Sequence, residues 1–221
     1  SKDHLDWIPE DERTIEKIVF EKTSSLLKSN IIVAKQSDEN TMNCIKKTIF
    51  NNHSNKLFFG KNYSYLINDN NFFYYKDKFG KLKLPIPNIL GEFQLENISS
   101  AIATLRSLDI GINEDHILKG IKKINNLGRL QKIEAGKLKD LVKNNTLIID
   151  GSHNENGSQV LNKYLETLNC RKHLVIGMMA NKQHEKYISY FKNISSVTTI
   201  DIPNQPNAIS GKELKNKFKS F

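Results

Sequence analysis

The spacing of apolar residues changes along the chain, and each spacing predicts a different kind of structure. In residues 13–27 and 38–51, apolar side chains recur every three or four positions, which is typical of helices with one buried face. Between these segments, residues 31–35 (IIVAK) form a short apolar run bounded by polar residues, which favours a buried strand. The first part of the chain is therefore predicted to contain a helix, a strand and a second helix.

An aromatic-rich tract follows, in which apolar and polar positions alternate. Its four segments are KLFFG, YSYLI, FFYYK and KLKLPIP, at residues 56–60, 63–67, 72–76 and 81–87. Their alternation, their aromatic content and the turn residues between them predict strands joined in hairpins. After Pro85 and Pro87 the spacing becomes helical, which predicts helices in residues 91–111 and 117–124.

Beyond Gly128, short apolar runs alternate with helical segments. Strands are predicted at residues 146–150, 173–179 and 196–202, and helices at 157–168, 185–191 and from 212 onward. Strands separated by helices of this length imply a parallel sheet, so the predicted fold class is α/β. Residues 132–145 (KIEAGKLKDLVKNN) are predicted to form an extended turn, and the domain boundary is placed at residues 125–127.

Composition and charge argue against several classes of protein. Hydrophobic residues make up 38% of the chain and charged residues 26%, which is enough apolar material for a folded core. The formal net charge of +9 comes mostly from dispersed lysines, whereas nucleic-acid-binding elements usually cluster Arg and Lys with aromatic residues. No apolar run approaches the ~20 residues of a membrane helix, no secretory leader opens the sequence, and Cys44 and Cys170 form no disulfide framework. We expect a soluble, cytoplasmic protein without nucleic-acid or membrane partners.

The strongest candidate for chemistry is the segment LIIDGSHNENG at residues 147–157. An apolar run ends in Asp150, and Gly151, His153 and Asn154 follow it. In open parallel sheets, ligands bind beyond the carboxyl ends of the strands, where a carboxylate can orient a ribose or a phosphate-bound metal. The same residues also suit an Asp-Gly turn followed by a helix N-cap, and spacing alone does not decide between these alternatives.

Three further groups are candidates, and each has a simpler structural alternative. Arg129 in NLGRL could pair with phosphate oxygens, or it could be a surface arginine after a glycine turn. Gln94 and Asn97 lie at a predicted helix start, where amides can read a nucleobase edge or cap the helix. In DHLDW, His4 and the neighbouring carboxylates could bind a divalent ion, or they could belong to a polar terminus. The sequence contains no GxxxxGK[ST] phosphate loop.

The order of these motifs resembles the folylpolyglutamate synthase/dihydrofolate synthase family of the Mur ligase superfamily. The motifs are DHLDW, FEKTSSLL, GEFQLEN, GRLQ, DGSHN and GMMANKQ, and the family pattern runs DHxDWLG, EKAGI, GxHQxxNAxxA, PGRxE, DGAHNP and DKD. A cell-wall Mur ligase would be expected to have His-Asn where this chain has Phe93-Gln94, so the folate branch is preferred. The chain departs from the pattern where Leu127 and Glu155 replace prolines and Ser152 replaces an alanine.

The resemblance implies roles for four residues of the first half of the chain. His4 matches the family histidine that helps to hold a magnesium ion. Lys22 matches the lysine of EKAGI, which is carbamylated in several members and then lies near the metal as an anionic group. Gln94 and Asn97 match the helix that lies against the adenine of ATP.

The resemblance also implies roles and a domain organisation for the second half. Arg129 matches a hinge arginine that reaches a phosphate, and Asp150 and His153 match residues that contact the ribose and the phosphates. Residues 1–126 would be the C-terminal part of a Mur-ligase-type central ATPase domain. Residues 127–221 would be a Rossmann-like C-terminal domain with a parallel sheet, which is incomplete.

For function, the resemblance implies an ATP-dependent, ADP-forming ligase that adds L-glutamate to dihydropteroate and/or tetrahydrofolate through an acyl phosphate. Its cofactors would be ATP and Mg²⁺, its partners would be these small-molecule substrates, and it would be a cytoplasmic monomer of folate biosynthesis. Because the family's phosphate loop would precede Ser1, the 221-residue segment alone is expected to be inactive. The alternative is a non-catalytic nucleotide-binding or interaction module derived from a Mur ligase.

Overall fold

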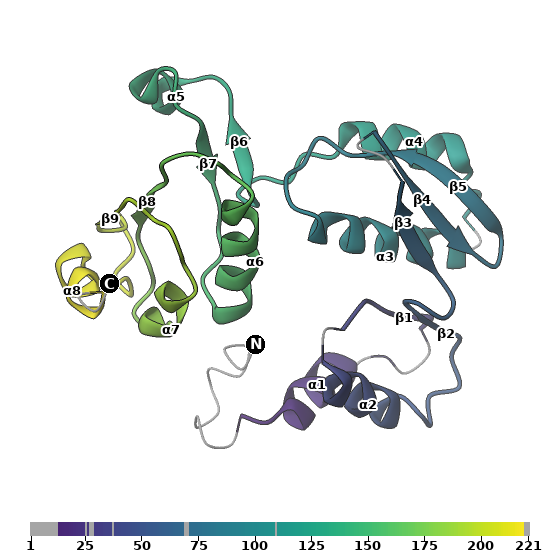
Figure 1. The fold of residues 1–221 in the computed structure, drawn as a ribbon. Helices are drawn as coiled ribbons and strands as arrows, with labels where there is room; N and C mark the ends of the chain where they lie inside the picture. The colour runs from purple at the N-terminus through teal and green to yellow at the C-terminus, as the bar shows by residue number, and fades with distance from the viewer. Residues whose placement is uncertain are drawn as a thin grey trace. The chain divides into compact units, whose positions relative to one another are not determined.

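A computed structural model describes residues 13–218 apart from residues 25, 27–28, 37, 69–70 and 109. The chain divides into two compact units (Figure 1). The first unit contains Arg13–Leu127 together with Gln131–Leu147, and the second contains Gly128–Leu130 together with the chain from Ile148 onward. The segment DHLDW, with His4, lies outside the described residues.

The first unit opens with two helices and two short strands. These are α1 (Ile15–Thr23), β1 (Ile31–Val33), α2 (Glu39–Thr48) and β2 (Lys56–Phe58). β1 and β2 pair in parallel, and Ile31, Val33 and Ile49 form a small core with residues of α2. α1 ends at Thr23 and not at residue 27 as the apolar spacing predicts, because the Thr23 hydroxyl donates back to the carbonyl of Val19 within a Thr-Ser-Ser run of poor helix formers.

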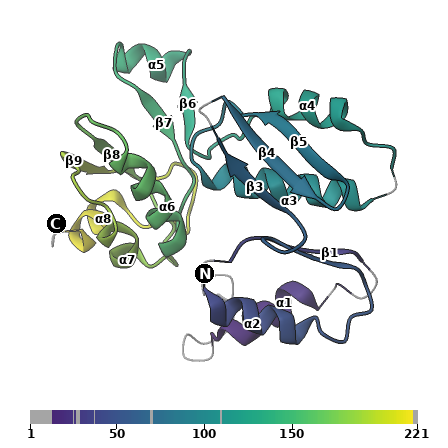
Figure 2. The same ribbon diagram turned by 45° about the vertical axis from the view of Figure 1, so that its right-hand side comes forward.

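The main core of the first unit lies between an antiparallel sheet and two helices. The elements are β3 (Ser64–Ile67), β4 (Phe72–Asp77), β5 (Gly80–Pro85), α3 (Phe93–Ser107) and α4 (Glu114–Lys123). The strands lie in the order β3-β4-β5, and alternate residues such as Phe73, Tyr75, Leu82 and Leu84 are buried. They pack against apolar residues of α3 and α4 (Figure 2), so both helices and the hairpins of the last three aromatic-rich segments are confirmed. The first segment, KLFFG, was wrongly predicted to join them, because its strand β2 pairs in parallel with β1.

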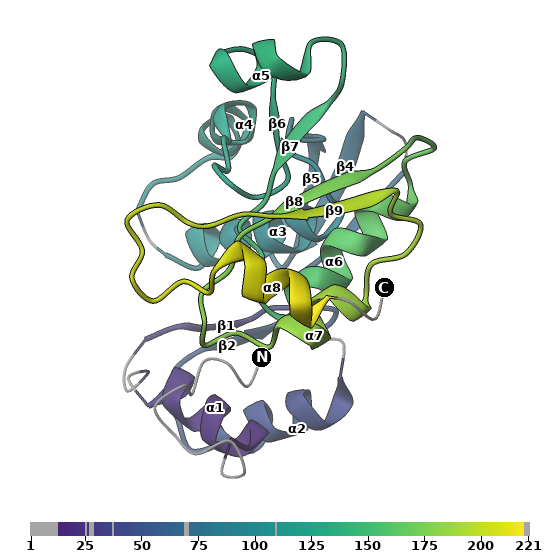
Figure 3. The same ribbon diagram turned by 90° about the vertical axis from the view of Figure 1, so that its left-hand side faces the viewer.

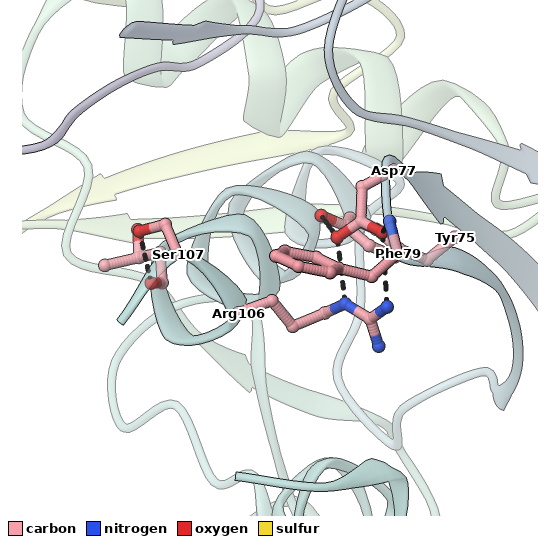
Figure 4. Close-up of polar contacts among 6 residues, drawn as sticks. Tyr75, Asp77, Phe79, Arg106 and Ser107 are labelled. Carbon is pink, nitrogen blue, oxygen red and sulfur yellow. Dashed lines mark hydrogen bonds and ion pairs between the residues drawn. The ribbon is translucent and has the colours of Figure 1, made fainter. Parts of the chain in front are cut away.

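A buried ion pair joins the sheet of the first unit to α3. Arg106 Nε donates to Asp77 Oδ2 at 2.8 Å and Arg106 Nη2 donates to Asp77 Oδ1 at 3.2 Å (Figure 4). The Tyr75 hydroxyl and the backbone N–H of Phe79 also donate to this carboxylate, at 3.2 and 2.9 Å. The two charged side chains are only 14% and 7% exposed, so the fork geometry and the two further donors offset the cost of burying them.

The segment predicted as an extended turn contains regular structure. β6 (Gln131–Ile133) and β7 (Leu147–Ile149) form a two-stranded sheet, and α5 (Lys137–Val142) lies between them in the sequence. Gly136 starts α5 with a φ of 100°, a backbone conformation that residues with a Cβ rarely adopt. The extended-turn prediction was therefore wrong, since a three-residue strand and a six-residue helix are too short to give a clear periodic pattern.

The second unit alternates helices and strands. Its elements after β7 are α6 (Glu155–Glu166), β8 (His173–Ile176), α7 (His184–Ser189), β9 (Ser196–Thr199) and α8 (Gly211–Lys217). β8 and β9 run side by side and pair in parallel (Figure 3), as the β/α alternation predicts. Apolar residues of the three helices form a common core that includes Leu165, Tyr187, Ile188 and Leu214. Among the described residues, no helix is long and apolar enough to cross a membrane.

Candidate functional site

The end of β7 is hydrogen-bonded to the segment that carries Arg129. Asp150 Oδ2 accepts the backbone N–H of Leu130 at 2.8 Å, and Asp150 Oδ1 accepts that of Ser152 at 2.8 Å. The backbone N–H of Gly151 donates to the carbonyl of Gly128 at 2.7 Å. The structure thus brings together two motifs that the sequence analysis treated separately, with Arg129 next to Asp150 and His153 in one unit.

The backbone around Arg129 is held in an uncommon conformation. Gly128 and Leu130 on either side of it have φ values of 67° and 47°. A leucine in the left-handed region costs on the order of 1–2 kcal/mol, so the surrounding contacts must hold it there. Two observations supply those contacts: Leu130 is 2% exposed, and its N–H is bound to Asp150. The Arg129 side chain is itself exposed, and it makes no hydrogen bond or ion pair within the described chain, so it is available to an anionic group.

The rest of DGSHN combines local structural roles with exposed polar groups. Asn154 caps α6, since its side chain accepts the N–H of Gly157 at 2.9 Å. Ser152 Oγ lies 3.0 Å from the Tyr187 hydroxyl, and burial, followed by the nearby Asp150 charge, raises the pKa of Tyr187. The His153 side chain is exposed, and its Nδ1 lies 3.1 Å from the carbonyl oxygen of Gly151. The turn and the N-cap are therefore confirmed, and contact of Asp150 and His153 with a ligand stays a prediction.

A second group of polar side chains lies in the first unit, at the start of α3. Gln94 is 2% exposed, and its Oε1 accepts from Asn97 Nδ2 at 3.3 Å and from Asn126 Nδ2 at 3.4 Å. The Gln94 Nε2 is buried and has no hydrogen-bond partner among the residues that the structure describes. A buried donor without an acceptor costs about 1–3 kcal/mol, so this amide fits a bound ligand that supplies an acceptor atom, such as a nucleobase. Asn126 was missed by the sequence analysis, because nothing in its neighbourhood marks a contact with α3.

The two remaining candidates are not brought into either group by the described residues. Lys22 lies in the last turn of α1 and is exposed. His4 is outside the described residues. In the part of the chain that the structure describes, no three His, Cys, Asp or Glu residues lie together as a metal site would require.

Comparison with known proteins finds similar structures but no match by sequence. No protein-family model matches the sequence, and no curated protein is similar enough to count as a match. A folylpolyglutamate synthase from Thermotoga maritima is similar over 96% of this chain and 50% of its own, with a TM-score of 0.75 and 23% identity. E. coli FolC in complex with DHPP and ADP is similar over 97% and 48%, with a TM-score of 0.78 and 23% identity.

A third similar structure contains a metal ion, a nucleotide analogue and an amino acid. It is a bifunctional folylpolyglutamate synthase/dihydrofolate synthase with Mn, AMPPNP and L-glutamate bound, similar over 93% of this chain and 47% of its own, with a TM-score of 0.74 and 18% identity. The chain therefore has the fold of folylpolyglutamate synthases and spans about half the length of the structures that it matches. The α/β fold implied by the sequence motifs is confirmed.

Proposed function

We propose that this chain is part of an ATP-dependent ligase that joins L-glutamate to dihydropteroate and/or tetrahydrofolate and releases ADP. The observation that carries the proposal is the fold, which is shared with solved folylpolyglutamate synthases over 96–97% of the chain. The proposal is supported by the pairing of the GR and DGSHN motifs through Asp150, and by the unpartnered donor of Gln94. The protein would act in the cytoplasm, as a monomer, in folate biosynthesis.

The second unit would act on the phosphates and the ribose. Arg129 carries a planar guanidinium that can donate two parallel hydrogen bonds to phosphate oxygens, and its backbone is fixed by Leu130 on one side and Gly128 on the other. His153, in the DGSHN motif, is exposed and can donate to a phosphate or a ribose oxygen. Asp150 would orient both side chains, because its two oxygens accept the N–H groups of Leu130, which follows Arg129, and of Ser152, which precedes His153.

The first unit would bind the base. Gln94 and Asn97 present amide groups at the start of α3, and the free Nε2 of Gln94 is a donor ready for a base atom. We assign Lys22 and His4 to the neighbourhood of a divalent cation, with Lys22 as a carbamylated, anionic group. When bound, Mg²⁺ would neutralise charge that develops on the phosphates.

The proposed reaction has two steps. A carboxylate oxygen of the folate substrate attacks the γ-phosphorus of ATP, which gives an acyl phosphate and ADP. The amine of glutamate then attacks the acyl carbon, phosphate leaves, and the amine loses a proton as the amide forms. The contribution of Arg129 and His153 would be to position the phosphate oxygens and to stabilise the negative charge that these oxygens gain during the transfer.

The test is a product assay with the complete gene product. The purified protein is incubated with MgATP, L-glutamate and either dihydropteroate or tetrahydrofolate, and the mixture is analysed by mass spectrometry. The proposal predicts a folate product that is heavier by one glutamyl residue, and one ADP released for each amide formed. No product should form when any one substrate is omitted. A folded protein that forms no glutamylated product from either folate substrate contradicts the proposal.

A further inference from the structure

We propose that Asn126 is a positioning residue that fixes the orientation of the Gln94 amide, so that Gln94 can only donate to the bound nucleobase. The inference rests on the proposed function, because it assumes that a nucleotide is the ligand. It assigns a role to a residue outside the sequence motifs, and it states which kind of base atom Gln94 contacts.

The geometry shows how the amide is oriented. The Gln94 oxygen accepts hydrogen bonds from two side chains, Asn97 from the next turn of α3 and Asn126 from the chain after α4, at 3.3 and 3.4 Å. A carbonyl oxygen has two lone pairs, so both are used. The Nε2 of the same amide is buried, and no described residue accepts a hydrogen bond from it. The side chain therefore offers a ligand two N–H donors and no free acceptor.

Asn126 matters more than its single bond suggests, because Asn97 alone leaves the amide free to turn over. With only Asn97 present, the Gln94 Oε1 could instead face the ligand while Nε2 donates to an Asn97 oxygen. The second donor from Asn126 makes that exchange unfavourable, since both asparagine amides would have to turn as well. Gln94 is thus held as a donor before the ligand arrives, and the ligand does not have to provide the ordering free energy.

The consequence is a preference for base atoms that accept hydrogen bonds. Purine rings carry such acceptors at their ring nitrogens, whereas the exocyclic amine of adenine is a donor that the Gln94 Oε1 is no longer free to accept. Gln94 would therefore contact a ring nitrogen of adenine and leave its 6-amino group to other residues.

A double-mutant cycle on ADP binding tests the role of Asn126. The complete gene product is compared with Asn126→Leu, Gln94→Met and the double variant by calorimetry, and Asn125→Leu, an exposed neighbour, is the control. Each single variant is expected to weaken ADP binding roughly fivefold to tenfold, while Asn125→Leu changes it less than about twofold. In the Gln94→Met background, Asn126→Leu should add less than about twofold, because Asn126 acts through Gln94.

A base analogue tests which kind of base atom Gln94 contacts. With the diphosphate of purine riboside, which lacks the 6-amino group, Asn126→Leu should weaken binding by the same factor as with ADP. A penalty that disappears with the analogue would mean that Gln94 accepts from the amine, and would overturn the inference. Additive penalties in the double-mutant cycle would also overturn it, while leaving the proposed function in place. A wild-type protein that binds no ADP at all contradicts the proposed function, and the inference falls with it.

Discussion

The carboxylate of Asp150 accepts the backbone N–H of Leu130 at 2.8 Å, across 20 positions of the chain. This bond connects the carboxyl end of β7 to the segment that holds Arg129, and it stabilises Leu130 in a left-handed conformation. An aspartate at the end of a strand is often interpreted as a group that faces a ligand. Here the same carboxylate also holds the backbone next to Arg129, so Asp150 is expected to act partly by positioning the Arg129 guanidinium.

Replacing Asp150 with alanine should lower both stability and activity. The variant loses two hydrogen bonds from backbone N–H groups to a charged acceptor, each of which is worth about 1.5–3 kcal/mol of unfolding free energy. Displacement of Arg129 by even 1 Å should lower kcat roughly 100-fold. Thermal unfolding and steady-state kinetics measure the two effects on the complete gene product.

Asp201→Ala is the matched control for Asp150→Ala. Asp201 Oδ1 accepts the N–H of Gly211 at 2.7 Å in the same unit, away from both motifs in the sequence. This variant loses one bond of the same kind, so it should lose less stability than Asp150→Ala and keep its kcat. If Asp150→Ala is folded and its kinetics equal those of the wild type, the carboxylate has only the turn-forming role.

Replacing Arg129 with lysine should lower the rate more than the nucleotide affinity. Lysine keeps the charge and loses the planar pair of donors, and a lost charge-assisted hydrogen bond of about 1.5–3 kcal/mol corresponds to roughly one to two decades in kcat. Arg171→Lys, at another exposed arginine of the same unit, should be within about twofold of wild type. Measured kcat and ADP affinity within twofold of wild type for Arg129→Lys would remove Arg129 from the site.

The Asp77–Arg106 ion pair should be important for the stability of the first unit. Arg106→Met leaves a buried carboxylate with a hydroxyl and one backbone N–H as its remaining donors, and removing one member of such a pair costs about 3–5 kcal/mol. Asp77→Asn combined with Arg106→Met should be less destabilised than Arg106→Met alone. The exposed pair Lys132–Glu134 is the control, since its loss should change stability by less than about 1 kcal/mol. Denaturant titration measures the unfolding free energies. Equal values for Arg106→Met and the control would show that the Asp77–Arg106 pair contributes little to stability.

Stability should decrease at alkaline pH, in part because of Tyr187. Burial raises the pKa of Tyr187 in the folded protein, so above the ordinary tyrosine pKa near 10 the unfolded chain loses this proton more readily than the folded one. The contribution is present below pH 10 and is lost as pH rises toward the folded pKa. Tyr187→Phe should therefore lose less stability than the wild type between about pH 9 and 11. Parallel curves for wild type and Tyr187→Phe would contradict this assignment.

The sequence predicted those features that depend on local patterns. Alternation predicted the strands of the β3-β4-β5 sheet, and the β/α spacing after Gly128 predicted β8 and β9 as parallel strands. β6 and α5 were missed because elements of three and six residues give too little periodicity to detect. The end of α1 was misplaced because Thr23 bonds to its own helix, which the apolar spacing does not record.

Within the candidate site, the division is similar. Asp150, His153 and Arg129 could be found from a strand end and a glycine-arginine pair. The bond from Leu130 to Asp150 could not, because it joins residues 20 positions apart through a left-handed leucine. Asn126 could not be found either, because what marks it is a hydrogen bond to the Gln94 amide, 32 positions earlier in the chain. Local pattern identifies single residues, and only the folded chain shows which of them hold one another in place.

The central claim is that this chain belongs to a ligase that activates a folate carboxylate as an acyl phosphate. The most direct measurement uses dihydropteroate or tetrahydrofolate with ¹⁸O in the reacting carboxylate, MgATP, L-glutamate and the complete gene product. The account predicts that inorganic phosphate gains one ¹⁸O atom for each amide formed, because the carboxylate oxygen bonded to phosphorus leaves with the phosphate. Amide formation with release of unlabelled phosphate would contradict it.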